Sequence, residues 1–261
     1  MTFIAGLNNI DNEIYLCADN RISFKKDKQI THQDNLQKIY FPLKNIVVAF
    51  TSNDLSEFKD FIGSMFSEIK THFDKHKFST FKKHSHIHRK IKSEIINLKS
   101  YAELLVGVIG GCGNKLYYYS SNGKCDKIKR GNYKYCGSAI SEGGDLFNKN
   151  VVKNSFKDGS YNLDLVNQWM NSNFTLFDKN DTFKTIGNAI HCVGSKNKQF
   201  CAYSTETTII FKNISTGYLI SFDSNSKTFV QKNLTTNDEI SLVSILNADF
   251  STISKNNVTF Q

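Results

Sequence analysis

The chain has 261 residues, enough for one large or two small domains with a sizeable buried core. Apolar residues make up 39% of it, with 15 glycines and one proline, and this composition excludes a largely disordered or proline-rich protein. The formal net charge of +9 is consistent with an anionic partner without identifying one. We expect neither a secretory signal nor a membrane span, and therefore a cytoplasmic protein.

The six cysteines are far apart in the sequence and form no CxxC pair. Several lie inside apolar runs, as Cys17 does, which is typical of buried thiols. We therefore predict free thiols, with neither disulfides nor a metal site, and no cofactor.

Apolar runs separated by turn-forming residues predict two β-hairpins at the start of the chain. They comprise residues 3–7 with 14–18, and residues 38–41 with 46–50. The only proline, Pro42, is interpreted as part of the turn of the second hairpin, and the polar stretch 24–35 as a connection.

Apolar residues spaced three and four apart then predict a helix that begins at an N-cap, Asp54 or Asn53. A second helix is expected around Ile87, Ile91 and Ile95. The histidine- and lysine-rich segment 78–88 before it, which contains the alternating histidines at 84, 86 and 88, is interpreted as a solvated basic loop rather than a metal site.

The second half of the chain continues the alternation of strand and helix blocks. Strands are predicted at 104–109, 115–120 and 125–129, helices at 140–154 and 163–174, and short strands from 189 to 231. The glycines at 110, 111 and 113 are interpreted as a turn between strands, not as a phosphate-binding loop. This order favours an α+β fold of antiparallel sheets covered by helix pairs over a parallel βαβ sheet.

The first residues of the chain could supply a catalytic nucleophile. If Met1 is removed, Thr2 presents a hydroxyl and a free α-amine together, and the amine can serve as the base that activates the hydroxyl. Residues 2–7 and 13–23, with the element Ala18-Asp19-Asn20-Arg21, resemble the opening of proteasome β-subunits and of the peptidase subunit of the bacterial two-component ATP-dependent protease.

This resemblance to the proteasome-type N-terminal-nucleophile (Ntn) hydrolases extends over residues 2–205. Its further matches are the segments 38–41, 45–50, 104–107, 115–118 and 135–139. It implies a four-layer αββα sandwich of two antiparallel sheets flanked by helix pairs. Residues 1–205 would form that domain, and residues 206–261 a β-rich C-terminal extension packed on it.

The resemblance also implies a function and the residues that perform it. The protein would be a threonine-type endopeptidase or amidohydrolase with Thr2 as nucleophile. Lys38 would carry the positive charge that lowers the pKa of the α-amine, and Asp19 would hold the lysine. Ser138 matches the serine near the amine, and Asp181 matches the aspartate before the final strands.

Three positions depart from the family pattern. Thr51-Ser52 stands where active members carry a glycine pair, although the backbone N–H of Ser52 can still bind the oxyanion. Phe3 replaces the usual small residue after the nucleophile. The interval from Asp19 to Lys38 is longer than usual, and an insertion around residues 25–33 would absorb it.

The expected partners are a peptide or unfolded-protein substrate and further copies of the chain, with an ATP-dependent unfoldase as an additional option and no membrane. Two other functions stay open. The chain could be a catalytically inactive proteasome-like scaffold subunit. It could also be, with less support, a basic module that binds an acidic protein or nucleic acid.

Overall fold

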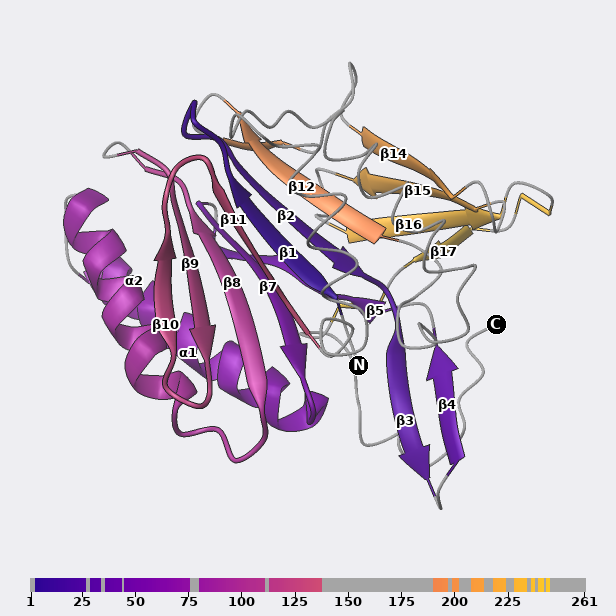
Figure 1. Ribbon diagram of the computed structural model, residues 1–261, viewed down its shortest axis with the longest axis horizontal. Coiled ribbons are helices and arrows are strands. Elements are labelled where there is room, and N and C mark those ends of the chain that lie inside the picture. Colours follow the sequence, from indigo (N-terminus) through magenta and orange to yellow (C-terminus); the bar gives the residue numbers. More distant parts are fainter. Residues whose placement is uncertain are drawn as a thin grey trace.

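The computed structural model describes residues 3–26, 29–33, 36–43, 45–75, 80–110, 113–137, 190–196, 199–201, 208–213, 218–223, 228–233, 236–237, 239–241 and 243–244. Within these ranges the chain forms two helices and two five-stranded antiparallel sheets, together with smaller sheets (Figure 1). The predicted α+β class is therefore confirmed. The helices predicted at 140–154 and 163–174 lie outside the described residues.

The first sheet is built around the N-terminal hairpin that the sequence predicts. Its strand order is β11-β1-β2-β12-β13. The strands are β1 (Ile4–Asn8), β2 (Ile14–Asp19), β11 (Asn132–Cys136), β12 (Ile190–Lys196) and β13 (Gln199–Cys201). Every residue of β1 and β2 is buried, so both faces of this sheet are covered at its centre.

The second sheet has the order β10-β9-β8-β7-β6. Its strands are β6 (Ile39–Leu43), β7 (Ile46–Ser52), β8 (Ala102–Val108), β9 (Lys115–Ser120) and β10 (Cys125–Ile128). Pro42 lies inside β6 and not in a turn, which corrects the sequence prediction. The strand tolerates it because β6 is an edge strand whose register with β7 shifts between Tyr40 and Leu43, where a missing N–H costs little.

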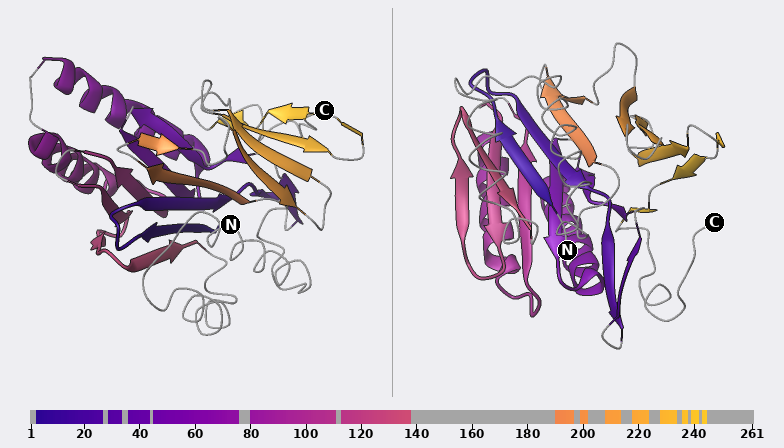
Figure 2. Two further views of the ribbon diagram at one scale, coloured as in Figure 1. Left: turned by 90° about the horizontal axis from the view of Figure 1, so that it is seen from above. Right: turned by 45° about the vertical axis from the view of Figure 1, so that its right-hand side comes forward.

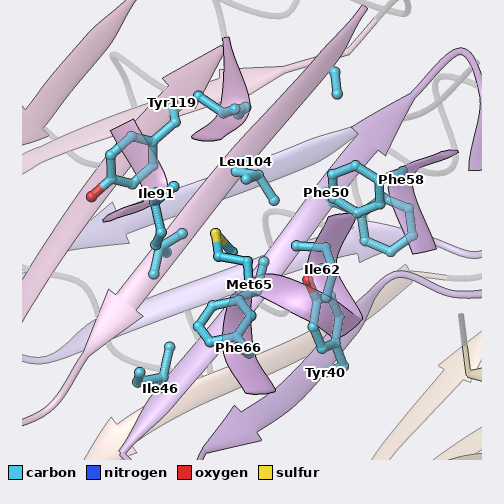
Figure 3. Packing of buried hydrophobic residues seen from close by; sticks show 14 of the residues in the cluster. Tyr40, Ile46, Phe50, Phe58, Ile62, Met65, Phe66, Ile91, Leu104 and Tyr119 are labelled. Atoms are coloured by element: carbon cyan, nitrogen blue, oxygen red, sulfur yellow. The ribbon is translucent and has the colours of Figure 1, made fainter. Parts of the chain in front are cut away.

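Two helices, α1 (Leu55–Lys75) and α2 (Thr80–Ile95), cover one face of the second sheet (Figure 1). Asp54 caps α1 as predicted, because its Oδ1 accepts the N–H groups of Ser56 (2.9 Å) and Glu57 (3.0 Å). Phe58 of α1 stacks on Phe50 of β7 with 4.6 Å between ring centroids (Figure 3). No helix in the described ranges is long and apolar enough to cross a membrane.

The histidine-rich segment belongs to α2, so its interpretation as a solvated loop is wrong. His84 lies one helical turn before Ile87 and two before Ile91, on the stripe that packs against the sheet, and it is only 2% exposed. The helical period therefore buries a side chain that its polarity alone would leave in solvent.

The two large sheets pack face to face, so the described elements form a helix layer and two sheet layers (Figures 1 and 2). Leu104 and Val106 of β8 belong to the core under the helices. Leu105 and Gly107, which alternate with them along the strand, face the first sheet. A Cβ on Gly107 would lie 2.9 Å from Ile14 Cδ1 and 3.1 Å from Leu16 Cδ1 of β2, so glycine permits this close approach.

The polar stretch after β2 is a hairpin of β3 (Ile22–Lys26) and β4 (Gln29–Gln33), which corrects the predicted connection. The C-terminal strands β14 (Thr208–Asn213), β15 (Tyr218–Asp223), β16 (Thr228–Asn233) and β17 (Glu239–Ser241) form a four-stranded antiparallel sheet (Figure 1). The last strand, β18 (Val243–Ser244), pairs in parallel with β5 (Leu36–Gln37). The domain boundary near residue 205 stays a prediction.

Candidate active site

Asp19 and Lys38 meet at one end of the two sheets. Lys38 Nζ lies 2.8 Å from Asp19 Oδ1, and the two side chains are 2% and 0% exposed. Asp19 ends β2 and Lys38 directly precedes β6. The β3–β4 hairpin between them returns the chain to its starting point, where the Leu36 N–H donates to the Asn20 carbonyl (3.0 Å). The long interval between the two predicted residues is therefore occupied by a hairpin.

The same carboxylate holds the start of the first strand. The Phe3 N–H donates to Asp19 Oδ1 (2.8 Å), and the Arg21 N–H donates to Oδ2 (3.0 Å). In return the Asp19 N–H donates to the Phe3 carbonyl (3.1 Å). Asp19 Oδ1 is thus shared by the lysine and by the backbone nitrogen that is bonded to Thr2. Phe3 itself is buried in the core.

A buried ion pair of this kind is weak evidence of a contribution to stability, because the cost of desolvating two charges is about as large as their attraction. A charged pair that is kept in the interior in spite of this cost is a reason to examine its surroundings for a functional role. The pair therefore marks this end of the molecule as a candidate active site.

Ser52, the predicted oxyanion donor, ends β7. Its hydroxyl donates to the Asp54 carbonyl (2.8 Å) and accepts from the Asp54 N–H (3.1 Å), so the side chain shapes the turn into α1. The Phe50 N–H donates to the Lys38 carbonyl (3.3 Å). Because N–H groups alternate along a strand, that of Ser52 points toward the same edge of β7, the edge on which Lys38 lies.

The end of β11 lies beside the start of β1, where Ile4 faces Cys136. The next residue, Gly137, donates its N–H to Oε2 of Glu103 in the other sheet (2.9 Å). Glu103 Oε1 accepts the hydroxyl of Tyr118 from the neighbouring strand (2.7 Å). The sequence analysis missed Glu103, although one signal was available, a glutamate inside the otherwise apolar strand β8.

The other predicted residues, Thr2, Ser138 and Asp181, lie outside the described residues. Each of Thr2 and Ser138 is adjacent in sequence to a described residue, since Thr2 directly precedes Phe3 and Ser138 directly follows Gly137. Of the six predicted site residues, the structure therefore brings Asp19 and Lys38 into contact. It also directs the N–H of Ser52 toward the edge of β7 on which Lys38 lies.

The described residues show no cluster of three or more histidine, cysteine or acidic side chains that could bind a metal ion. The histidines of α2 are used in packing instead. The His86 ring stacks on that of His72 (4.2 Å between centroids), and His88 Nδ1 lies 3.0 Å from the Tyr119 hydroxyl. Cys17 and Cys136 are buried thiols, as predicted, and the thiol of Cys125 is half-buried.

No family model matches this chain, and its sequence matches none of the curated proteins.

Proposed function

We propose that the protein is a threonine-type peptidase or amidohydrolase in which Thr2, exposed by removal of Met1, is the nucleophile. One observation supports this most directly. Lys38 Nζ and the Phe3 N–H donate to the same oxygen of Asp19, each at 2.8 Å. Since Phe3 is bonded to Thr2, this shared oxygen supports a role for the buried lysine next to the start of the chain.

In the proposed reaction, the Thr2 hydroxyl oxygen attacks the carbonyl carbon of the substrate amide while the α-amine takes the hydroxyl proton. The positive charge of Lys38 favours the neutral amine that can accept this proton. The Ser52 N–H stabilises the oxyanion. The C–N bond then breaks, the leaving amine takes the proton, and water hydrolyses the ester on Thr2. Ser138 and Asp181 would assist beside the amine.

We also propose the four-layer αββα sandwich for the complete domain. The described helices cover only the second sheet, yet every residue of β1 and β2 in the first sheet is buried. A further layer over that sheet, formed by the helices predicted at 140–154 and 163–174, would account for this burial. Hydrogen exchange of the backbone amides tests this proposal, and slow exchange is expected along both segments.

The proposal includes assembly into a homo-oligomer that shelters the site, with unfolded protein as substrate and an ATP-dependent unfoldase as a further partner. This part is supported by the family resemblance alone. Native mass spectrometry of the purified protein tests it, since a purely monomeric species at micromolar concentration would contradict it.

The decisive experiment combines intact mass with covalent labelling. The mature protein should lack Met1 and should gain one adduct from a threonine-directed electrophile. Thr2→Ala should abolish both the adduct and peptide hydrolysis, whereas Thr71→Ala, which changes a solvent-exposed threonine of α1, should abolish neither. Retention of Met1 would exclude the mechanism. Removal of Met1 without labelling or hydrolysis would favour the inactive scaffold.

A further inference from the structure

Glu103 connects the two sheets at the end of the molecule that carries the candidate site. It projects from β8 in the second sheet, is 8% exposed, and accepts the N–H of Gly137, which follows β11 of the first sheet, at 2.9 Å. Its other oxygen accepts the Tyr118 hydroxyl at 2.7 Å. Both carboxylate oxygens are therefore held, one from each sheet.

A carboxylate is a costly means of joining two sheets. Burying its charge carries a desolvation cost that an apolar contact would avoid. The charge also acts on its neighbours. Burial, and after it the nearby Glu103 charge, raise the pKa of the Cys136 thiol well above its ordinary value. In exchange, the carboxylate fixes the direction of a backbone N–H, because charged acceptors form short and strong hydrogen bonds.

The backbone held in this way belongs to two segments of the candidate site. Gly137 has a φ of +109°, a conformation that favours glycine, where the chain leaves β11 toward Ser138. In the second sheet, Glu103 faces Thr51 of β7, the residue directly before Ser52. Residues opposite each other on paired strands share a face, so Glu103 lies between the chain that precedes Ser138 and the chain that carries the Ser52 N–H.

We propose that Glu103 is a positioning residue that fixes the end of β11 to β8, the strand that pairs with β7, and so sets the alignment of the groups around Thr2. This inference rests on the proposed function and adds to it a residue that would act through the backbone N–H of Gly137 and not on the substrate itself. Small displacements of reacting groups cost large factors in rate, so this attachment should affect the chemical step more than the binding of a substrate.

The test measures acylation of Thr2 by the threonine-directed electrophile in wild type, Glu103→Gln and Glu13→Gln. The control residue Glu13 also accepts a tyrosine hydroxyl, that of Tyr15, but next to the opposite end of the β1–β2 hairpin. Glu103→Gln should lower the maximal acylation rate by about 10- to 100-fold, with little change in the electrophile concentration that gives half-maximal rate. Glu13→Gln should stay within about twofold of wild type.

The outcomes separate the two proposals. If wild type is acylated and Glu103→Gln reacts as fast, the positioning role is wrong and the proposed function stands. If wild type is not acylated, the proposed function fails and this inference fails with it. If Glu103→Gln does not fold, Tyr118→Phe replaces it, since this variant removes one of the two groups that hold the carboxylate, and an unchanged maximal rate there overturns the proposal.

Discussion

Lys38 and Asp19 form an ion pair that is closed off from solvent, with 2.8 Å between Nζ and Oδ1. Two backbone N–H groups, those of Phe3 and Arg21, also donate to the carboxylate. The negative charge would therefore stay fixed in place if the lysine were removed, and it would lose its countercharge. This geometry makes the energetic role of the pair directly measurable.

Lys38→Met should lower the free energy of unfolding by about 3–5 kcal/mol, because it leaves the Asp19 carboxylate buried without its countercharge. Adding Asp19→Asn removes that charge, so the double variant should be less unstable than the sum of the two single variants by about 1 kcal/mol or more. Urea unfolding of the four proteins measures this coupling. Simple additivity would show that the two side chains do not interact.

The hairpins β1–β2 and β6–β7 and the helix α1 could be predicted from the sequence, because their apolar residues repeat with the period of the element. The same rule failed for the first half of α2. His84 lies on the buried stripe with Ile87 and Ile91. Because histidine is a polar residue, it does not count toward the apolar repeat, and the predicted helix therefore began too late.

The candidate site, too, could be predicted from the sequence only in part. Asp19 and Lys38 could be paired in advance only through the family resemblance, since the β3–β4 hairpin between them changes their spacing without changing their contact. Glu103 escaped prediction because a single charged residue in a strand has no periodic signal. Its partner Gly137 lies 34 residues further along the chain, so only the stacking of the two sheets brings them together.

The N-cap of α1 gives a second prediction. Asp54→Ala should cost about 1 kcal/mol of unfolding free energy, because the N–H groups of Ser56 and Glu57 lose their acceptor. Asp60→Ala is a matched control on the exposed side of the same helix and should change stability by less than about 0.5 kcal/mol. Thermal unfolding followed by circular dichroism compares them. Equal effects would mean that Asp54 does not act as a cap.

The α2 histidines predict a loss of stability in mild acid. The pKa values of all three lie below the ordinary value of 6.5, chiefly because of burial. Positive neighbours add to this: Lys115 for His84; His72, Arg89 and Lys90 for His86; Lys92 and Lys115 for His88. The unfolded chain therefore takes up protons first as the pH falls through 6.5, so stability is greatest above that pH and decreases below it.

Urea unfolding at pH 7.5 and pH 5.5 measures this effect. His84→Met replaces the most deeply buried of the three with an apolar side chain and should reduce the difference in unfolding free energy between the two pH values. Lys70→Gln, on the exposed side of α1, should leave that difference as it is in wild type. If His84→Met keeps the full wild-type difference, the loss of stability in acid does not come from the buried histidine of α2.

Two glycines predict opposite effects of the same substitution. Gly107 lies between the sheets, where an added Cβ would approach Ile14 Cδ1 and Val47 Cγ1 to 2.9 Å, so Gly107→Ala should cost about 1–3 kcal/mol of unfolding free energy. Gly63 lies on the exposed side of α1 with nothing within 4 Å of an added Cβ. Gly63→Ala should therefore stabilise the protein by about 0.5–1 kcal/mol through its higher helix propensity. Urea unfolding of both variants measures these changes in unfolding free energy. A stabilising Gly107→Ala would contradict the close packing of the two sheets.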